Sequence, residues 1–294
     1  MRQYSTIGLM GRFSNTNTGE TFEHLYHHLH SLGLNVIVDA DLEPQLPFTA
    51  ERTETAEQLG RHCDMVVVVG GDGSMLAAGR VLCEYDVPVL GVNRGRLGFL
   101  TDVTPAMIEQ SLAAVLAGEF VVEKRFLLEM GLEREDQSLG SGVALNDVVL
   151  NSGFSARMIE FELYIDDDFV YRQRSDGLIV STPTGSTAYA LSAGGPITHP
   201  RLNALMLVPM NPHTLSSRPL VVDGDSLVRV QITDYNEVDP VISCDGQVNL
   251  NAGPGDIVHV RKKSAHLTLL HPPGHSFYAT CREKLGWGNR PGEA

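Results

Sequence analysis

A carboxylate surrounded by glycines is the first candidate for chemistry in this sequence. Asp72 lies in "GGDGS" at 70–74, directly after the apolar run "MVVVV" at 65–69. The stretch has neither the ending of a Walker A loop nor the spacing of a dinucleotide fingerprint. Backbone N–H groups in such a turn can bind phosphate, which a carboxylate should repel. Two roles stay open for Asp72: it caps the following helix, or it accepts a proton from an attacking hydroxyl group.

A second pair of polar residues interrupts a strand pattern. Asn146 and Asp147 stand in "LNDVVLN" at 145–151, although Asn and Asp are depleted in strands. They form either a bulge or strand end, or a pair that hydrogen-bonds a ligand. In the second case the carboxylate would accept from ribose hydroxyls and the amide would match an adenine edge.

Threonines and serines fill "STPTGST" at 181–187, beside several glycines. They suggest the wall of a polar pocket, and Tyr189 could stack on a base. The start of a helix would explain Thr184 or Ser186 but not the whole run. In "ISCDGQ" at 242–247, a plain hairpin turn explains the Asp-Gly pair.

The elements that must position these residues fall into two groups. Before residue 120 the pattern predicts strands at 4–9, 35–40, 64–69 and 87–93, and helices at 20–32, from about 74, and at 104–120. This alternation is typical of a Rossmann-like α/β domain with a parallel sheet. After residue 125, short strands separated by turn residues indicate an all-β, sandwich-like domain. The tail at 276–287 is helical again and is expected to pack back on the first domain.

Two domains are therefore expected, each long enough to bury a core. The first is an α/β domain of residues 1–125, together with the C-terminal tail 275–294. The second is a β-rich domain of residues 126–274.

The composition limits the possible partners. The net charge is −14, from 22 basic and 36 acidic residues, which argues against nucleic-acid binding. The apolar runs are too short to span a bilayer, and the start lacks the apolar stretch of a secretory signal. We therefore expect a cytoplasmic protein without membrane contact. Any bound phosphate must be held by backbone dipoles, a few arginines or a metal ion.

Cysteines and histidines give no sign of a metal site. The pattern contains no CxxC pair and no His/Cys cluster with zinc spacing, and the histidines at 24–30 are expected on a solvated helix face. Buried free thiols are expected at Cys63, Cys83, Cys244 and Cys281.

Taken in order, these stretches resemble the NAD kinase family over nearly the whole chain. The matching motifs are "GGDG" at 70–73, "GVNRGRLGFLTD" at 91–102, "NDVVL" at 146–150, "SDGLIVSTPTGSTAYALSAGGP" at 175–196, "LVPMNPHTLSSRPLV" at 207–221 and "SCDGQ" at 243–247. Phosphofructokinases and lipid kinases share GGDG-like loops. The former should alternate strand and helix in their C-terminal half, and the latter are not expected to carry "TPTGSTAYALS".

The resemblance implies transfer of the γ-phosphate of ATP to the 2′-hydroxyl of the adenosine ribose of NAD⁺. Asp72 would accept the ribose proton, while Mg²⁺ carried by the ATP phosphates, and no metal site built by the protein, would offset its charge. The loop near the phosphates would comprise Gly70, Gly71, Gly73 and Ser74. The implied dinucleotide-binding residues are Asp72, Gly73, Asn146, Asp147, Arg157, Arg174, Asp176, Thr187, Ala188, Tyr189, Ala190, Leu191, Ser192 and Gln247.

Position 174 is often lysine in the family, and arginine keeps the charge but changes the geometry. The resemblance also implies a homo-oligomer, a dimer or tetramer, whose sites include residues of a neighbouring subunit. A lipid or sugar kinase and a non-catalytic nucleotide sensor are the alternative functions. Consumption of NAD⁺ with formation of NADP⁺ would separate the expected activity from both.

Overall fold

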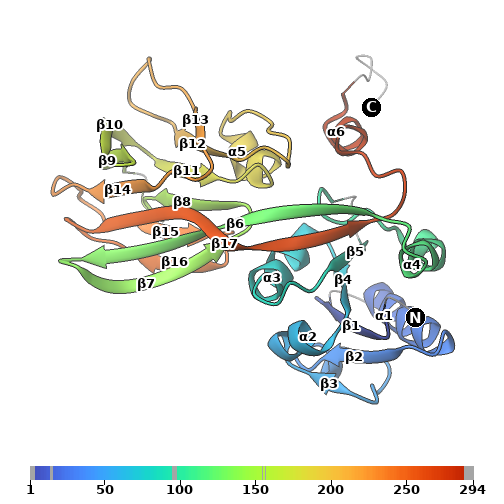
Figure 1. Cartoon of the computed structure of the whole chain (residues 1–294). Coiled ribbons are helices and arrows are strands. Elements are labelled where there is room, and N and C mark those ends of the chain that lie inside the picture. Colours follow the sequence, from blue (N-terminus) through green and yellow to red (C-terminus); the bar gives the residue numbers. More distant parts are fainter. Residues whose placement is uncertain (1–3, 14–15, 95–97, 154, 156, 288–294) are drawn as a thin grey trace. The chain divides into compact units, whose positions relative to one another are not determined.

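The structure, a computed structural model, describes residues 4–13, 16–94, 98–153, 155 and 157–287 (Figure 1). It divides into a first unit, Met1–Lys124 with His266–Ala294, and a second unit, Arg125–Ala265. Strands β6 (Val121–Arg134) and β17 (Ile257–His271) belong partly to both units, because the boundaries fall inside them. Each unit has a buried apolar core of its own.

The first unit is built on a parallel sheet in the order β3-β2-β1-β4-β5, with the end of β17 added beside β5 (Figure 1). All six residues of β4 are buried, as expected for a central strand covered on both faces. The strand bounds are β1 (Thr6–Gly11), β2 (Asn35–Asp39), β3 (Thr53–Glu54), β4 (Met65–Gly70) and β5 (Val89–Asn93).

Helices cover both faces of this sheet. Leucines of α1 and α4 share a core with alternate residues of β1 and β4, whereas α2 and α3 contact one another and pack on the other residues of β1. The helical segments are α1 (Thr16–Ser31), η1 (Glu43–Gln45), α2 (Ala56–His62), α3 (Asp72–Leu82), η2 (Pro105–Met107), α4 (Ile108–Leu116) and α6 (Phe277–Leu285). Helix α2 was not predicted from the sequence, and α3 begins two residues earlier than the pattern indicated.

The C-terminal helix α6 packs on the first unit, as expected. Ser276 caps its start, since its hydroxyl accepts from the N–H of Ala279. Cys281 is fully buried, and the ammonium of Lys284 lies 5.2 Å from the ring centre of Phe99. All four cysteines are buried thiols outside any disulfide among the described residues, which confirms that expectation.

The second unit is a β-sandwich. One layer contains β10-β9-β14-β17 together with β6 and β7, and the other has the order β13-β12-β11-β8-β15-β16. Alternate residues of both layers form a common core around Phe161. The remaining strand bounds are β7 (Gln137–Ala144), β8 (Asp147–Asn151), β9 (Ile159–Ile165), β10 (Asp168–Ser175), β11 (Gly177–Ser181), β12 (Ala204–Met210), β13 (Leu220–Asp223), β14 (Val228–Ile232), β15 (Val241–Cys244) and β16 (Val248–Asn251).

A short helical segment covers the outer face of the second layer. It consists of η3 (Gly185–Thr187) and α5 (Tyr189–Ser192). Ala190 of α5 is buried against Val149, Ile179 and Met206 of the sheet beneath it. The segment therefore forms a fixed platform at the end of β11, and the predicted class, an α/β layer followed by a β sandwich, is confirmed.

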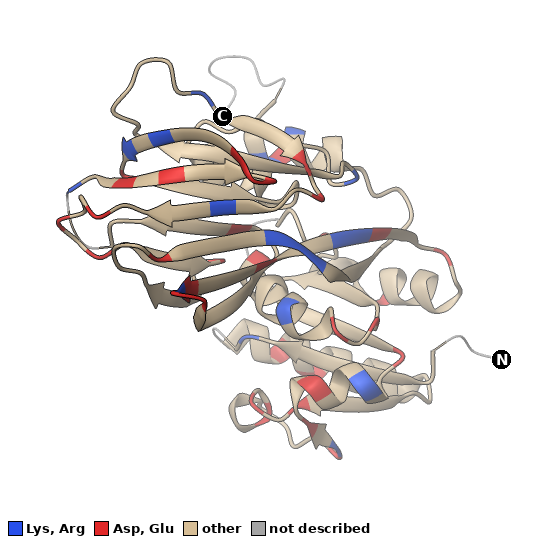
Figure 2. Cartoon of the chain, turned by 60° about the vertical axis from the view of Figure 1, so that its left-hand side comes forward, with Lys and Arg blue, Asp and Glu red and all other residues tan. Residues whose placement is uncertain are grey.

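The surface of the second unit carries charges of both signs. Lysines and arginines lie interspersed with aspartates and glutamates on its strands (Figure 2). Some pair across neighbouring strands, as Arg172 does with Glu162 at 2.6 Å. No helix of the described residues is long and apolar enough to cross a membrane.

Candidate functional site

The glycine loop of the first unit joins β4 to the N-terminus of α3. Gly70 has φ +150°, and a Cβ there would lie 2.2 Å from the hydroxyl of Ser74. A side chain at Gly71 or Gly73 would meet no atom within 4 Å, so the backbone borders open space at both positions. A helix N-terminus with accessible backbone of this kind suits an anion such as phosphate.

Asp72 does not cap the helix that follows it. Gly71 is the N-cap of α3, and Asp72 is already the first helical residue. One carboxylate oxygen of Asp72 accepts from the N–H of Phe99 and the other from the N–H of Leu100, each at 3.0 Å. A Cβ at Gly98 would lie 2.1 Å from this carboxylate. The loop after β5 thus holds Asp72 in place, and the helix-cap interpretation is wrong.

In the second unit, Asn146 and Asp147 lie at the start of β8 and are held by Asp245. The Asp245 carboxylate accepts from the N–H of Leu145 at 2.9 Å, of Asn146 at 2.8 Å and of Asp147 at 3.3 Å. Asp245 has φ +52° and is followed by Gly246 at +66°, as the tight turn after β15 requires. A plain hairpin turn is therefore an incomplete account of this Asp-Gly pair.

The hydroxyl run after β11 has a role different from the predicted pocket wall. Ser181, Thr182 and Ser186 are fully buried. The Thr182 hydroxyl donates to the carbonyl of Leu145 at 2.7 Å, and its N–H donates to the carbonyl of Asn146 at 2.9 Å. The Ser181 and Thr182 hydroxyls thus fix the backbone that presents Asn146, whereas the Ser186 hydroxyl donates to the carbonyl of Pro183.

A pocket of about 370 Å³ lies between the start of β8 and the start of α5. It gathers four of the predicted binding residues, Asn146, Asp147, Ala188 and Tyr189. The Tyr189 side chain is 45% exposed and so remains free to pack on a ligand. The rest of the lining is Val149, Asn151, Ser243, Asp245 and Gly246.

Asp147 is the titratable group most altered by this environment. Burial raises its pKa, and the nearby charge of Asp245 raises it further, to about 7. Near neutral pH the Asp147 carboxyl is therefore partly protonated, and it can both donate and accept hydrogen bonds.

The other predicted binding residues lie outside the lining of that pocket. Arg157 forms an ion pair with Glu237. Arg174 lines a different pocket, of about 530 Å³, with His213 and Arg218. Asp176 accepts from the amide of Asn211 at 2.8 Å, and the hydroxyl of Thr187 donates to the carbonyl of Thr184. Leu191, Ser192 and the buried Ala190 lie on α5. Gln247 lies at the end of the β15–β16 turn.

One cluster of polar residues in the first unit was not predicted from the sequence. Ligand atoms of Asp102, His271 and His275 lie within 4.8 Å of one another. The spacing of two histidines in "HPPGH" at 271–275 was the available signal. The histidines of α1, the only ones considered from the sequence, are not part of this cluster.

Comparisons of the fold point to a class of enzyme. The crystal structure of yeast NADH kinase complexed with NADH superposes with a TM-score of 0.87 at 26% identity, covering 99% of this chain and 92% of that chain. An NAD kinase from Archaeoglobus fulgidus in complex with ATP gives a TM-score of 0.71 at 27% identity, covering 96% and 97%. The fold is thus that of the dinucleotide kinases.

Sequence comparisons narrow this class to a family. The ATP-NAD kinase N-terminal domain matches residues 7–120, and the ATP-NAD kinase C-terminal domain matches residues 145–271. An NAD kinase from Chromohalobacter salexigens is 55% identical over 293 residues, which is 100% of both chains. The chain belongs to the ATP-NAD kinase family, as its motifs predicted.

Proposed function

We propose that this chain transfers the γ-phosphate of ATP to the 2′-hydroxyl of the adenosine ribose of NAD⁺, which gives NADP⁺. The observation that carries the proposal is the match to both domains of the family, joined to the geometry of Asp72. Two backbone N–H groups fix the direction in which this carboxylate presents its free lone pairs. A fixed carboxylate beside a glycine loop fits phosphoryl transfer from ATP to an alcohol, because it can accept the hydroxyl proton while the loop borders the phosphates.

Asp72 acts in this proposal as the acceptor of the ribose proton. Each of its oxygens uses one lone pair on a backbone N–H and keeps another for the substrate hydroxyl. The open backbone at Gly71 and Gly73 leaves room for ATP phosphates at the end of α3, with Gly70 and Ser74 shaping the turn. Mg²⁺ would be held mainly by the phosphates and water, and it would supply charge neutralisation.

The second unit supplies the dinucleotide contacts. Asn146, Asp147, Ala188 and Tyr189 already share one pocket, which supports their assignment to NAD⁺. Asp147 would hydrogen-bond ribose hydroxyls, and the ring of Tyr189 would pack on the nucleotide. We extend the assignment, as a proposal, to Gly73, Arg157, Arg174, Asp176, Thr187, Ala190, Leu191, Ser192 and Gln247, with Ala190 acting through its backbone because its side chain is buried.

Three further features form part of the proposal. The enzyme is cytoplasmic, which agrees with its buried thiols, since reducing compartments keep thiols reduced. It works as a homo-oligomer, a dimer or tetramer, with subunit contacts near the sites. Its folding domains are residues 1–125 with 275–294, and residues 126–274.

One assay tests the function directly. Purified full-length protein is incubated with ATP, Mg²⁺ and NAD⁺, and NADP⁺ is measured. NADP⁺ should form only when all three are present, while diacylglycerol and fructose 6-phosphate should not be phosphorylated. Binding of NAD⁺ without formation of NADP⁺ would instead indicate a nucleotide sensor.

A further inference from the structure

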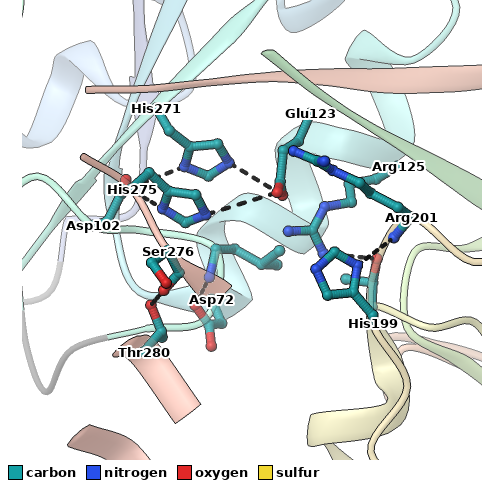
Figure 3. A network of polar contacts seen from close by, with 12 residues as sticks. Asp72, Asp102, Glu123, Arg125, His199, Arg201, His271, His275, Ser276 and Thr280 are labelled. Carbon is teal, nitrogen blue, oxygen red and sulfur yellow. Dashed lines mark hydrogen bonds and ion pairs between the residues drawn. The ribbon is translucent and has the colours of Figure 1, made fainter. Parts of the chain in front are cut away.

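Two histidines of the C-terminal segment hold one aspartate of the loop after β5 (Figure 3). A single oxygen of the Asp102 carboxylate lies 3.0 Å from Nδ1 of His271 and 2.8 Å from Nδ1 of His275. Because a carboxylate can only accept, both Nδ1 atoms donate to it. Its other oxygen is buried and has no hydrogen-bond partner among the described residues. The position of Asp102 therefore depends on the two imidazoles.

Asp102 is ionised, because the histidines stabilise its charge. Burial would raise the pKa of Asp102, but the hydrogen bonds from His271 and His275 outweigh burial and lower the pKa to about 2. Burial would lower the pKa of His271, but Asp102 and Glu123, on opposite sides of the rings, raise it (Figure 3). Hydrogen bonds to an ionised carboxylate are stronger than those between neutral groups, so Asp102 is held firmly.

The histidines themselves are fixed by the sheet and by the start of α6. His271 is the last residue of β17, and this end of β17 pairs with β5. His275 lies in a turn, in which its N–H donates to the carbonyl of Pro272 at 3.3 Å, and it directly precedes Ser276, the N-cap of α6. The two rings stack with centres 3.7 Å apart. Both donors to Asp102 thus come from well-supported backbone.

Asp102 lies in the short segment that supports Asp72. The N–H groups of Phe99 and Leu100 donate to the Asp72 carboxylate, each at 3.0 Å. Directly after Asp102, Val103 forms a bridge to β5. Asp102 is therefore placed between the backbone that holds Asp72 and the backbone that joins the sheet.

Helix α6 contacts the same segment at a second point. The ammonium of Lys284 lies 5.2 Å from the ring centre of Phe99, within the range of a cation–π contact. The C-terminal segment thus contacts the loop on both sides of Leu100, through Phe99 and through Asp102. Both contacts restrict the backbone N–H groups that Asp72 needs.

We propose that His271 and His275 are positioning residues for the phosphoryl transfer: they hold Asp102, and through it the loop 98–102 that directs the Asp72 carboxylate. The effect on turnover rests on the proposed function, whereas the effect on the loop does not. Without its donors, the charge of Asp102 would have to turn toward solvent or toward a new partner. A shift of the loop would then misdirect Asp72, and small displacements of a catalytic group are costly.

The first test compares His275→Phe with His275→Asn in the full-length protein. Phenylalanine keeps a ring that can stack on His271 but removes the N–H, whereas the asparagine amide can still donate to Asp102. We expect His275→Phe to lower kcat by about tenfold, while the KM values for ATP and NAD⁺ change by less than about threefold. His275→Asn should recover most of the lost kcat.

A double variant with Asp72→Asn shows whether His275 acts through Asp72. His275→Phe should cost less than about twofold in the Asp72→Asn background, because no proton acceptor is left to position. His62→Phe is the matched control, since His62 also contacts a carboxylate of the first unit, Glu54, at 2.7 Å. It should leave kcat unchanged. Equal losses from His275→Phe in both backgrounds, or a His275→Phe protein with normal kcat, would overturn the proposal.

Hydrogen exchange, measured by NMR without nucleotide, tests the loop independently of turnover. The N–H groups of Phe99 and Leu100 should exchange at least about tenfold faster in His275→Phe than in the parent, while those of α2 keep their rates. This change in a chain that forms no NADP⁺ would overturn the proposed function and leave the role of the histidines standing. Unchanged exchange at both residues would overturn that role. If His275→Phe does not fold, Asp102→Asn takes its place with the same expected direction of change.

Discussion

The carboxylate of Asp245 accepts a hydrogen bond of 2.8 Å from the backbone N–H of Asn146, 99 residues earlier in the chain. The same carboxylate also accepts from the N–H groups of Leu145 and Asp147. The turn after β15 thus determines the position of the two residues that resemble the dinucleotide ligands of the family. Asp245 is a positioning residue for this pocket as well as part of its lining.

Replacing Asp245 by alanine should affect dinucleotide binding more than ATP binding. The substitution leaves three backbone N–H groups without their acceptor, so we expect a loss of about 1–3 kcal/mol in the free energy of unfolding. The KM for NAD⁺ should rise at least several-fold, while the KM for ATP changes little. Asp223→Ala, at an exposed position of β13, serves as the control. An unchanged KM for NAD⁺ would contradict the positioning role.

Asp147 should make stability depend on pH. Its pKa is about 7 in the folded chain, against an ordinary value of 3.8. Between these values the folded state holds a proton that the unfolded state has released. The contribution of Asp147 to the free energy of unfolding should therefore be largest below pH 4, fall by about 1.4 kcal/mol per pH unit as pH rises toward 7, and then level off.

Urea unfolding of the parent and of Asp147→Asn at several pH values between 4 and 8 measures this contribution. The difference in free energy between the two proteins should change across this range in favour of the variant at high pH. Asp168→Asn, in the exposed β9–β10 hairpin, is the control and should run parallel to the parent. Parallel curves for Asp147→Asn as well would rule out the raised pKa.

Tyr189 should contribute to the affinity for NAD⁺. Its exposed ring borders the pocket that contains Asn146 and Asp147. Tyr189→Ala should raise the KM for NAD⁺ roughly tenfold, equivalent to about 1–2 kcal/mol, with little change for ATP. Tyr235→Ala removes an even more exposed ring and should have no effect. A loss confined to ATP would show that this segment does not bind the dinucleotide.

Local patterns were enough to predict the order of most elements. The buried run at 65–69 and the alternating residues of the second unit specify their strands by apolar periodicity. Helix α2 was not predicted, because it has only seven residues in a polar region. Only the capping box of Thr55 and Gln58 marks its start. Short segments of this kind gain their stability from packing, which periodicity does not reveal.

The sites were harder to predict, because their key contacts join distant parts of the chain. Asn146 and Tyr189 were identified through family motifs, and the structure brings them into one pocket. The role of Asp245 depends on strand pairing between β8 and β15. The hydroxyls of Thr182 and Ser186 suggested the wall of a polar pocket in the sequence, but the fold buries them. Residue type alone does not distinguish a polar group that binds a ligand from one that holds the backbone.

Gly98 should be required for the position of Asp72. A Cβ at this residue would lie 2.1 Å from one Asp72 oxygen and 2.5 Å from the Thr101 hydroxyl. Gly98→Ala should lower kcat by about tenfold or more, because small displacements of a catalytic group are costly. Gly131→Ala, where a Cβ meets no atom within 4 Å, is the control. Normal turnover in Gly98→Ala would show that the loop tolerates the shift.

Replacing Asp72 by asparagine should remove most of the turnover. The amide keeps the size of the carboxylate but cannot accept a proton, so kcat should fall by about 10²–10⁴-fold. Its NH₂ group would also face the N–H of Phe99 or Leu100, so we expect a loss of about 1–3 kcal/mol in stability. NAD⁺ binding should stay within several-fold, since the proposed contacts are mainly in the second unit.

Comparing this variant with Gly98→Ala separates proton transfer from positioning. Gly98→Ala keeps the carboxylate and disturbs only its support, so it should retain more activity than Asp72→Asn. Melting temperature, NAD⁺ affinity and kcat are measured on both variants under the same conditions. A folded Asp72→Asn protein with near-normal kcat would remove this carboxylate from the mechanism, because a residue that only supports the loop can be replaced without stopping the chemistry.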